Sequence, residues 1–207
     1  MLFGPVRLIS KLLSLVVFAA VVYVVVCGVQ VVNASRLSTA PDSVRPAAAI
    51  VVLAEPVAKA DRTDLTARLR HAALLYRSNR APKVLLTWYP PSAGEVGSLS
   101  YDTSWLEAHG VVSSALVARE APNAVVALSK AAKLFDRRDS GVIVVTDAID
   151  ALWTQGAGSA DGLTLQVSPP PSSKKFVFDE IGPLLRESTG VAVGRVFGFG
   201  RAAWAAY

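Results

Sequence analysis

The sequence is poor in residues that build disulfides and metal centres. Its 207 residues include one cysteine, Cys27, and two histidines, His71 and His109. A lone cysteine excludes an intramolecular disulfide and leaves the redox compartment unspecified. The histidines lie far apart in the sequence, so they form neither a spaced metal pair nor an obvious catalytic triad. We therefore expect no metal site, and we expect both histidines to be structural.

Charge is absent from one long stretch near the N-terminus. From Leu12 to Val32 the sequence reads LLSLVVFAAVVYVVVCGVQVV, with 21 residues and no charged side chain. As a helix rising about 1.5 Å per residue it would span roughly 30 Å, the thickness of a bilayer's hydrocarbon core. The stretch predicts a transmembrane helix, and membrane lipid is then the partner of residues 12–32.

A cleaved signal peptide is the alternative interpretation of this stretch, because small residues near Ala34 suit a signal peptidase. The apolar core of a signal peptide covers only about 7–15 residues, which favours an uncleaved anchor. Arg7 and Lys11 precede the span, whereas Arg36 and Arg45 follow it. With the α-amino group this modest bias favours a cytoplasmic N-terminus over residues 1–11. We expect a single-pass protein of the cell membrane whose domain lies outside the cytoplasm.

Basic residues are in excess, but they are not clustered. The net charge is +5, and the arginines are scattered along expected helices without a groove-reading motif. Solvated helix faces explain them better than nucleic-acid binding, so no nucleic-acid partner is expected. Residues 33–47 are polar, contain proline and lack periodicity, which is typical of a linker.

Strands and helices alternate in the expected domain, residues 48–207. Alternation of this kind predicts a mainly parallel sheet covered on both sides, that is, a Rossmann-like three-layer α/β/α domain. The strand candidates are apolar and β-branched: Ala48 to Ala54, Lys83 to Trp88, Ser114 to Arg119, Gly141 to Thr146 and Leu163 to Ser168.

Two amphipathic helices lie between the strands. In the first, Asp64 to Ser78, the arginines Arg68, Arg70 and Arg77 are expected to point away from the apolar face. A C-terminal helix is also expected, with four residues packed on the sheet: Phe178, Ile181, Leu184 and Leu185. The apolar residues of the first two helices are Leu65, Leu69, Ala72, Ala73 and Tyr76, and, within Pro122 to Phe135, Val125, Leu128, Ala132 and Phe135.

Beyond Gly190 the tail mixes arginines, Arg195 and Arg201, with aromatic residues. Such a mixture suits a membrane interface or a partner groove, and it equally suits a terminus folded back on its own domain. The aromatic residues are Phe197, Phe199, Trp204 and Tyr207.

The segment RLRHAALLYRSNRAPKVLLT, Arg68 to Thr87, resembles the helix-to-strand signature of the SanA/ElyC/YdcF family of bacterial envelope proteins. Asn79 stands where that family usually has glycine, and asparagine also tolerates a left-handed helix C-cap. The resemblance covers about residues 48–168. It implies a Rossmann-like domain in the cell envelope, tethered by a single anchor.

The sequence departs from the family pattern where strands end. Glu55 and Pro56 replace a glycine run after the first strand, so backbone N–H groups are poorly placed to hold phosphate. After the fourth strand, the family's histidine and its proline-arginine pair are missing, and Asp147, Asp150 and Leu152-Trp153 stand there instead. The site that the resemblance implies is erased or rebuilt.

The ligand crevice of such a sheet lies beyond the carboxyl ends of its strands. Three acidic residues there, Asp147, Asp150 and Glu55, are the catalytic candidates. A simpler interpretation of two of them is that Asp147 caps the helix that follows, while Asp150 in the first turn is favoured by the helix dipole. The ligand-binding candidates at the same edge are Thr87, Trp88, Tyr89, Glu120, Asn123 and Thr146.

Two functions remain open at this point. The favoured one is a binding or scaffold role in envelope biogenesis or barrier maintenance, with an envelope protein or a glycan as partner, through the Trp88-Tyr89 loop. The alternative is a divergent enzyme acting on envelope precursors or a small ligand. The sequence identifies no cofactor.

Overall fold

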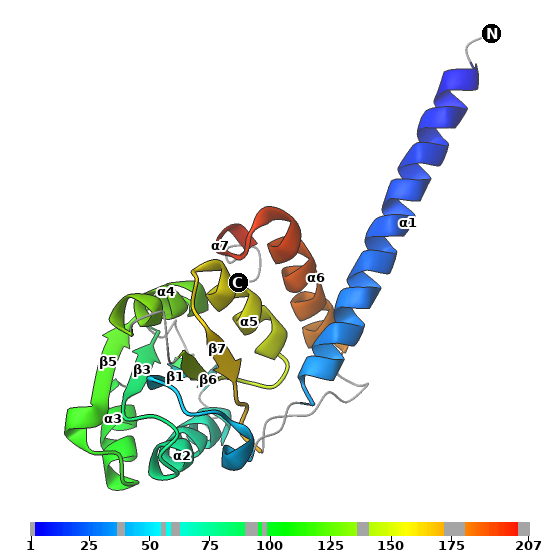
Figure 1. Ribbon diagram of the computed structural model, residues 1–207. Coiled ribbons are helices and arrows are strands. Elements are labelled where there is room, and N and C mark those ends of the chain that lie inside the picture. The colour runs from blue at the N-terminus through cyan, green and yellow to red at the C-terminus, as the bar shows by residue number, and fades with distance from the viewer. Residues whose placement is uncertain are drawn as a thin grey trace.

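The computed structural model describes residues 3–36, 40–54, 57–58, 63–89, 95–96, 99–135, 141–171 and 181–202. They form a long N-terminal helix, α1 (Phe3–Ala34), and an α/β domain beside its C-terminal end (Figure 1). α1 runs two residues beyond Val32, into the segment expected as a linker, which also holds a short 3-10 turn, η1 (Pro41–Ser43). From Ile9 to Ala34 α1 is long and apolar enough to cross a membrane.

The domain is built on a five-stranded, all-parallel sheet, which confirms the expected Rossmann-like fold. Every expected strand is present, with its ends shifted by at most two residues. The order across the sheet is β5-β3-β1-β6-β7, and a small antiparallel pair, β2 with β4, lies apart from it. The strands are β1 (Ala49–Ala54), β2 (Val57–Ala58), β3 (Val84–Trp88), β4 (Glu95–Val96), β5 (Leu116–Glu120), β6 (Val142–Val145) and β7 (Leu165–Val167).

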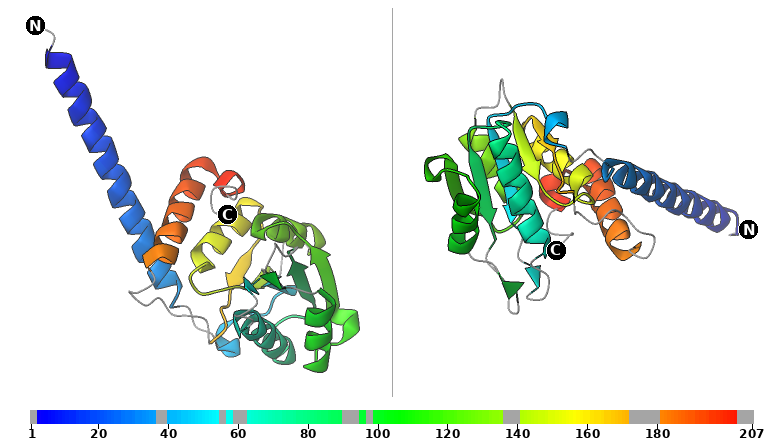
Figure 2. Two further views of the ribbon diagram at one scale, coloured as in Figure 1. Left: turned by 180° about the vertical axis from the view of Figure 1, so that it is seen from behind. Right: turned by 90° about the horizontal axis from the view of Figure 1, so that it is seen from below.

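Helices cover both faces of the sheet (Figure 2). α2 (Thr63–Arg77) and α3 (Leu99–Ala108) lie on one face, while α4 (Ala124–Leu134) and α5 (Ala151–Ala160) lie on the other. Alternate residues of each central strand face opposite layers, so Ile50 and Val52 pack toward α2, and Val51 and Leu53 toward α4. Because both faces are buried, the strands carry unbroken apolar runs rather than an alternating pattern.

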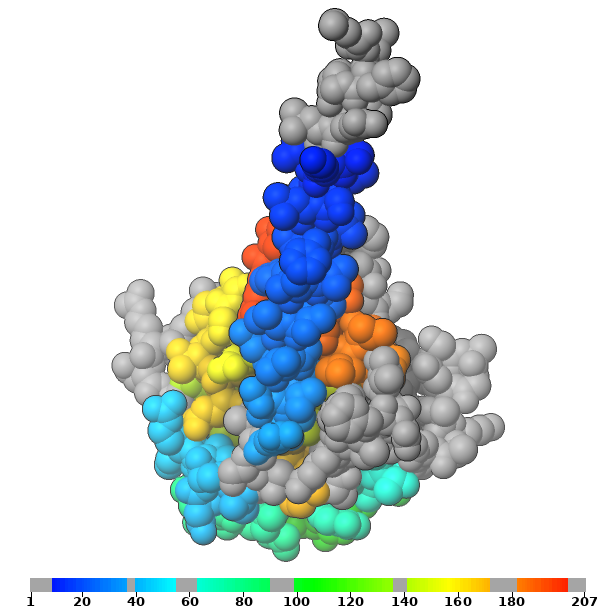
Figure 3. Space-filling model, turned by 90° about the vertical axis from the view of Figure 1, so that its right-hand side faces the viewer, coloured from blue at the N-terminus to red at the C-terminus, as the bar shows by residue number. Residues whose placement is uncertain are grey.

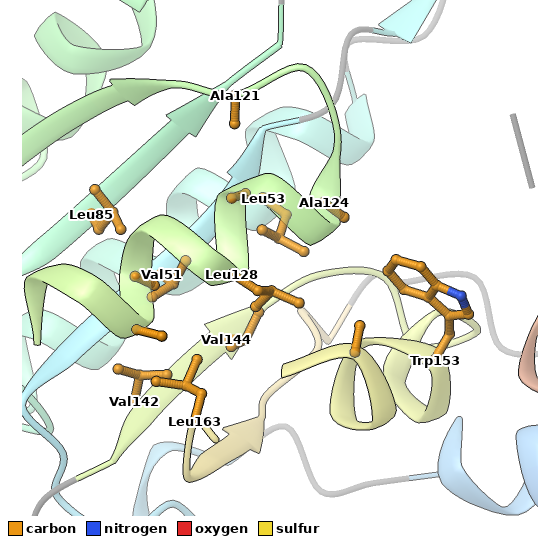
Figure 4. Packing of buried hydrophobic residues seen from close by; sticks show 14 of the residues in the cluster. Val51, Leu53, Leu85, Ala121, Ala124, Leu128, Val142, Val144, Trp153 and Leu163 are labelled. Atoms are coloured by element: carbon orange, nitrogen blue, oxygen red, sulfur yellow. The ribbon is translucent and has the colours of Figure 1, made fainter. Parts of the chain in front are cut away.

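Figure 4 shows the core on the α4 face. Leu128 of α4 lies over Val51 and Val144, the centre of the sheet, and Trp153 of α5 lies at the far edge of the same cluster. Each of these aliphatic side chains is fully buried, and burial of one such side chain contributes about 1.5–3 kcal/mol. The apolar strands and the amphipathic helix thus account for the position of the sheet's carboxyl edge.

Two helix ends follow the expected turn chemistry. Asn79, just after α2, has a φ of 55°, the left-handed conformation predicted for it as a C-cap. Gly110, after α3, has a φ of 95°, and it leads into a short 3-10 turn, η2 (Ser113–Ala115), before β5. These turns bring β3 and β5 back to the sheet in parallel.

The C-terminal helix, α6 (Ile181–Phe197), does not pack on the sheet, and that prediction was wrong. It packs on α5 and on the last turns of α1, which already cover this side of the domain (Figure 3). Leu184 is half-buried in that contact, whereas Leu185 is 54% exposed. Phe178 and the side chain of Ile181 lie outside the described residues.

The chain folds back on the domain after α6, as one of the two interpretations of the tail predicts. α7 (Phe199–Ala202) places the Phe199 ring against two glycines: a Cβ on Gly156 would lie 2.2 Å from its Cζ, and one on Gly194 would lie 2.6 Å from its Cδ1. The ring also meets Trp153 edge-on, with centroids 6.3 Å apart. The side chain of Arg201, and Trp204 and Tyr207, lie outside the described residues.

Candidate functional site at the carboxyl edge of the sheet

The sheet register brings most of the predicted site residues to one edge. Ala54 pairs with Trp88 and Trp88 with Glu120, while Val52 pairs with Val145, the residue before Thr146. Strand order reverses between β1 and β6, because β3 lies on one side of β1 and β6 on the other. A crevice at such a switch point is where ligands bind in open α/β sheets. Glu55 lies outside the described residues.

Arg68 of α2 occupies the switch point. Its Nη1 donates to the Leu53 carbonyl at the end of β1 at 2.6 Å, and its Nη2 donates to Oδ2 of Asp147, beyond β6, at 3.0 Å. The Arg68 side chain is 4% exposed and that of Asp147 is 28% exposed. The guanidinium therefore ties the end of β1 to the segment after β6, and Asp147 supplies the counter-charge that a buried cation requires.

The burial of Arg68 corrects the expectation that it points to solvent. Leu65, Arg68 and Ala72 lie at positions i, i+3 and i+7, which form a single stripe on a helix. That stripe packs on the sheet, and both Leu65 and Ala72 are buried in it. Arg70, two residues further along, is exposed as expected. The spacing in the sequence already placed Arg68 among the apolar residues, although its charge argued against burial.

The N-cap position of α5 is Asp150 and not Asp147, which differs from the simpler interpretation of these two residues. α5 begins at Ala151, its N-cap is Asp150 in a helical conformation, and the Asp150 side chain makes no capping hydrogen bond. The backbone carbonyl of Asp147 accepts from the Asp150 N–H at 3.1 Å. The carboxylate of Asp147 accepts a charge-assisted hydrogen bond from the buried guanidinium of Arg68.

A second buried polar pair lies beside Arg68. His71, one turn along α2, shares a 2.8 Å hydrogen bond between its Nε2 and Oγ of Ser168, the residue after β7. Both side chains are buried, and His71 Nδ1 has no hydrogen-bond partner among the described residues. Burial lowers the pKa of His71 from 6.5 to about 4, since the charged imidazolium would lose its hydration. His71 is thus neutral near pH 7.

His109, by contrast, lies at the far end of α3. Its ring stacks on Trp105 with centroids 3.5 Å apart, and its Nδ1 lies 2.7 Å from the Trp105 carbonyl oxygen. These contacts give His109 a local structural role at a helix end. Sequence analysis missed the His71–Ser168 pair, because a pattern of residues does not show that Ser168 and α2 meet across the sheet edge.

Two of the predicted ligand-binding residues, Thr87 and Thr146, are buried. Oγ1 of Thr87 donates to the Val52 carbonyl at 2.8 Å, a bond within the sheet. Asn123 caps α4, since its side chain accepts from the Val126 N–H at 3.0 Å. The structure thus gives Thr87 and Asn123 internal partners in place of a ligand.

The remaining ligand-binding candidates differ in exposure. Trp88 is half-buried, Tyr89 is buried and Glu120 is exposed. The indole Nε1 of Trp88 is buried without a hydrogen-bond partner among the described residues. The backbone carbonyl of Glu120 accepts from Nζ of Lys130. Among the described residues there is no group of three or more histidine, cysteine, aspartate or glutamate side chains suited to holding a metal ion.

No family model matches this chain, and neither a curated protein nor a solved structure matches it.

Proposed function

We propose that the chain is a membrane-anchored protein of the bacterial cell envelope whose SanA/YdcF-like domain binds or scaffolds a partner in envelope biogenesis or barrier maintenance. One observation carries the proposal. The cation at the switch point, Arg68, is paired with the chain's own carboxylate, Asp147, and is nearly inaccessible. A carboxylate of the protein thus takes the place that an anionic ligand would occupy in a working crevice.

The other polar groups at this edge support the same role. A general base that works near neutral pH needs a pKa near that pH and access to its proton. The lowered pKa of His71 and its burial satisfy neither condition. Ser168, to which His71 is hydrogen-bonded, is fully buried, so it cannot meet a substrate without movement of the chain. The burial of His71 and Ser168 therefore favours a structural role for this pair over a role in proton transfer.

The membrane anchor places this domain at a bilayer surface. α1 supplies the apolar length that a span needs, and the basic residues before it favour a cytoplasmic N-terminus. Protease added to intact spheroplasts should therefore digest the domain, and an immunoblot against a C-terminal epitope should lose its signal. Full protection, with digestion only after lysis, would reverse the proposed orientation.

Anion binding tests the state of the crevice. Titration calorimetry of the full chain in detergent, with nucleotides and polyprenyl phosphate analogues, should give dissociation constants weaker than the low micromolar range. The physical reason is that the Asp147 carboxylate already neutralises Arg68 and repels a second anion.

The matched variant for this titration is Asp147→Asn, which keeps the shape of the side chain and removes its charge. We expect the variant to bind phosphate compounds more tightly than the parent, because Arg68 loses its counter-ion. A parent dissociation constant near 1 μM, about −8 kcal/mol, would contradict the scaffold role and support a divergent enzyme instead.

A further inference from the structure

The burial of α1 changes along its length. From Ile9 to Tyr23 its side chains are exposed on every side, as expected for a helix surrounded by lipid. From Val24 onward one face is covered: Val24 is half-buried, and Cys27 and Val31 are buried against the domain. The opposite face stays apolar and exposed as far as Val29. The last turns of the apolar span are therefore docked on the domain.

α6 lies antiparallel to these turns of α1 (Figures 1 and 2). The two helices approach closely at Gly28, where a Cβ would lie 3.2 Å from Oγ of Ser188. From Ser188 to Phe197, α6 continues toward the N-terminal end of α1 for up to about 13 Å, at roughly 1.5 Å per residue. This half of α6 thus points to the side of the domain from which the apolar span projects, and the two helices diverge toward the end of α6 (Figures 1 and 2).

The end of α6 is apolar and exposed. Val196 is 63% exposed and Phe197 is 64% exposed. The ten residues from Ser188 to Phe197 carry a single charge, on Arg195. If this surface faced water, two large apolar side chains would be exposed to solvent without an apolar partner.

The one charge in this segment is turned toward the C-terminal turns of α1. Nη1 of Arg195 donates to Oε1 of Gln30 at 2.5 Å and lies 4.0 Å from Sγ of Cys27. Gln30 follows Val29, the last exposed apolar residue of the span. Side chains on a helix lean toward its N-terminus, so the Arg195 guanidinium reaches back toward the polar end of α1. Long basic side chains at a membrane surface lean toward water in the same manner.

The position of this helix end is set by the domain. Phe199, two residues after Phe197, is seated against Gly156 of α5 and Gly194 of α6. The α6–α7 arch, defined here as residues 191–202, is therefore held against α5. Its apolar tip lies on the side of the domain from which α1 projects (Figures 1 and 3).

We infer that the α6–α7 arch is a second membrane contact, and that Val196 and Phe197 enter the same bilayer leaflet that the C-terminal turns of α1 cross. The inference rests on the membrane anchor of the proposed function. Lipid is the occupant because the exposed apolar tip lies on the side of the domain from which the exposed apolar part of α1 projects. Interfacial apolar side chains commonly insert about 5–10 Å, which is within the reach of this helix end.

The test places a fluorescent label at single cysteines of the full chain in vesicles of phosphatidylcholine and phosphatidylglycerol. The background is Cys27→Ser, and the label, nitrobenzoxadiazole, is attached at Phe197→Cys, at Val16→Cys inside the span, or at Val112→Cys. Val112 is 55% exposed and precedes η2, far from α1, and it serves as the aqueous control. Lipids with a doxyl group on the acyl chain quench a label that contacts them.

We expect the label at Phe197 to be quenched at least about half as strongly as the label at Val16, and the label at Val112 to remain unquenched. A label at Val196→Cys should repeat the result. If Cys27→Ser does not fold, the parent serves as background, because buried Cys27 is shielded from an aqueous maleimide.

The possible failures are distinguishable. An unquenched label at Val16 would overturn the anchor and the inference together. Quenching at Val16 with no more quenching at Phe197 than at Val112 would overturn the inference alone. A blue-shifted label at Phe197 that doxyl lipids do not quench would show a protein partner on the arch, and that result also overturns it.

Discussion

Replacing Arg68 by alanine is expected to lower the free energy of unfolding by about 3–5 kcal/mol. The substitution removes the partner of the Leu53 carbonyl, leaves Asp147 without its cation and opens a cavity under the sheet edge. Urea unfolding of the full chain in detergent, followed by tryptophan fluorescence, measures the change.

The matched control is Arg70→Ala on the same helix. Arg70 is exposed, so its loss should change stability by less than about 0.5 kcal/mol. Equal effects of the two substitutions would show that Arg68 is not the buried link between β1 and β6. A stable Arg68→Ala variant that has lost a biological activity would point instead to a ligand at this residue.

Acidification should destabilise the domain through His71. Its folded pKa is lowered to about 4, while the unfolded chain takes up the proton near 6.5. The stabilising contribution is therefore complete above pH 6.5 and is lost as the pH falls from 6.5 toward 4. The shift corresponds to a loss of about 3 kcal/mol over that window.

The variant His71→Gln isolates this contribution, since glutamine stays neutral and can still bond to Ser168. The measurement compares the unfolding midpoints of parent and variant across the same pH window. We expect the parent to lose stability on acidification more steeply than the variant. Parallel pH profiles would mean that His71 is accessible to protons in the folded state. His109→Gln is the control, because that ring lies at a helix end with no part in the buried pair.

Much of this architecture is predictable from local pattern. The strands could be placed because each is an apolar, β-branched run bounded by turn residues, and both faces of a parallel sheet are buried. Asn79 was identifiable as a left-handed C-cap because asparagine is among the few residues that adopt that conformation readily. Local chemistry decides these features, so each of them can be predicted from the sequence of its own segment.

The candidate site was less predictable because its partners are distant in sequence. Arg68 and Asp147 come from different elements, and only the parallel register places them together at the switch point. The prediction that α6 packs on the sheet failed for a similar reason. A helix with apolar residues can cover a sheet, another helix or a membrane, and the sequence of the helix does not distinguish these surfaces. Here the last turns of α1 supplied a surface that sequence analysis had assigned entirely to lipid.

The docking of α1 on α6 has a practical consequence for producing this protein. A fragment that starts at Ala48, after the expected linker of residues 33–47, would lack Cys27 and Val31. It would expose the face of α6 that these two residues cover. Such a fragment would be expected to aggregate even though every strand of its sheet is intact. The shortest chain that keeps this contact begins near Val24, within the apolar stretch, so detergent or lipid has to accompany the domain through purification.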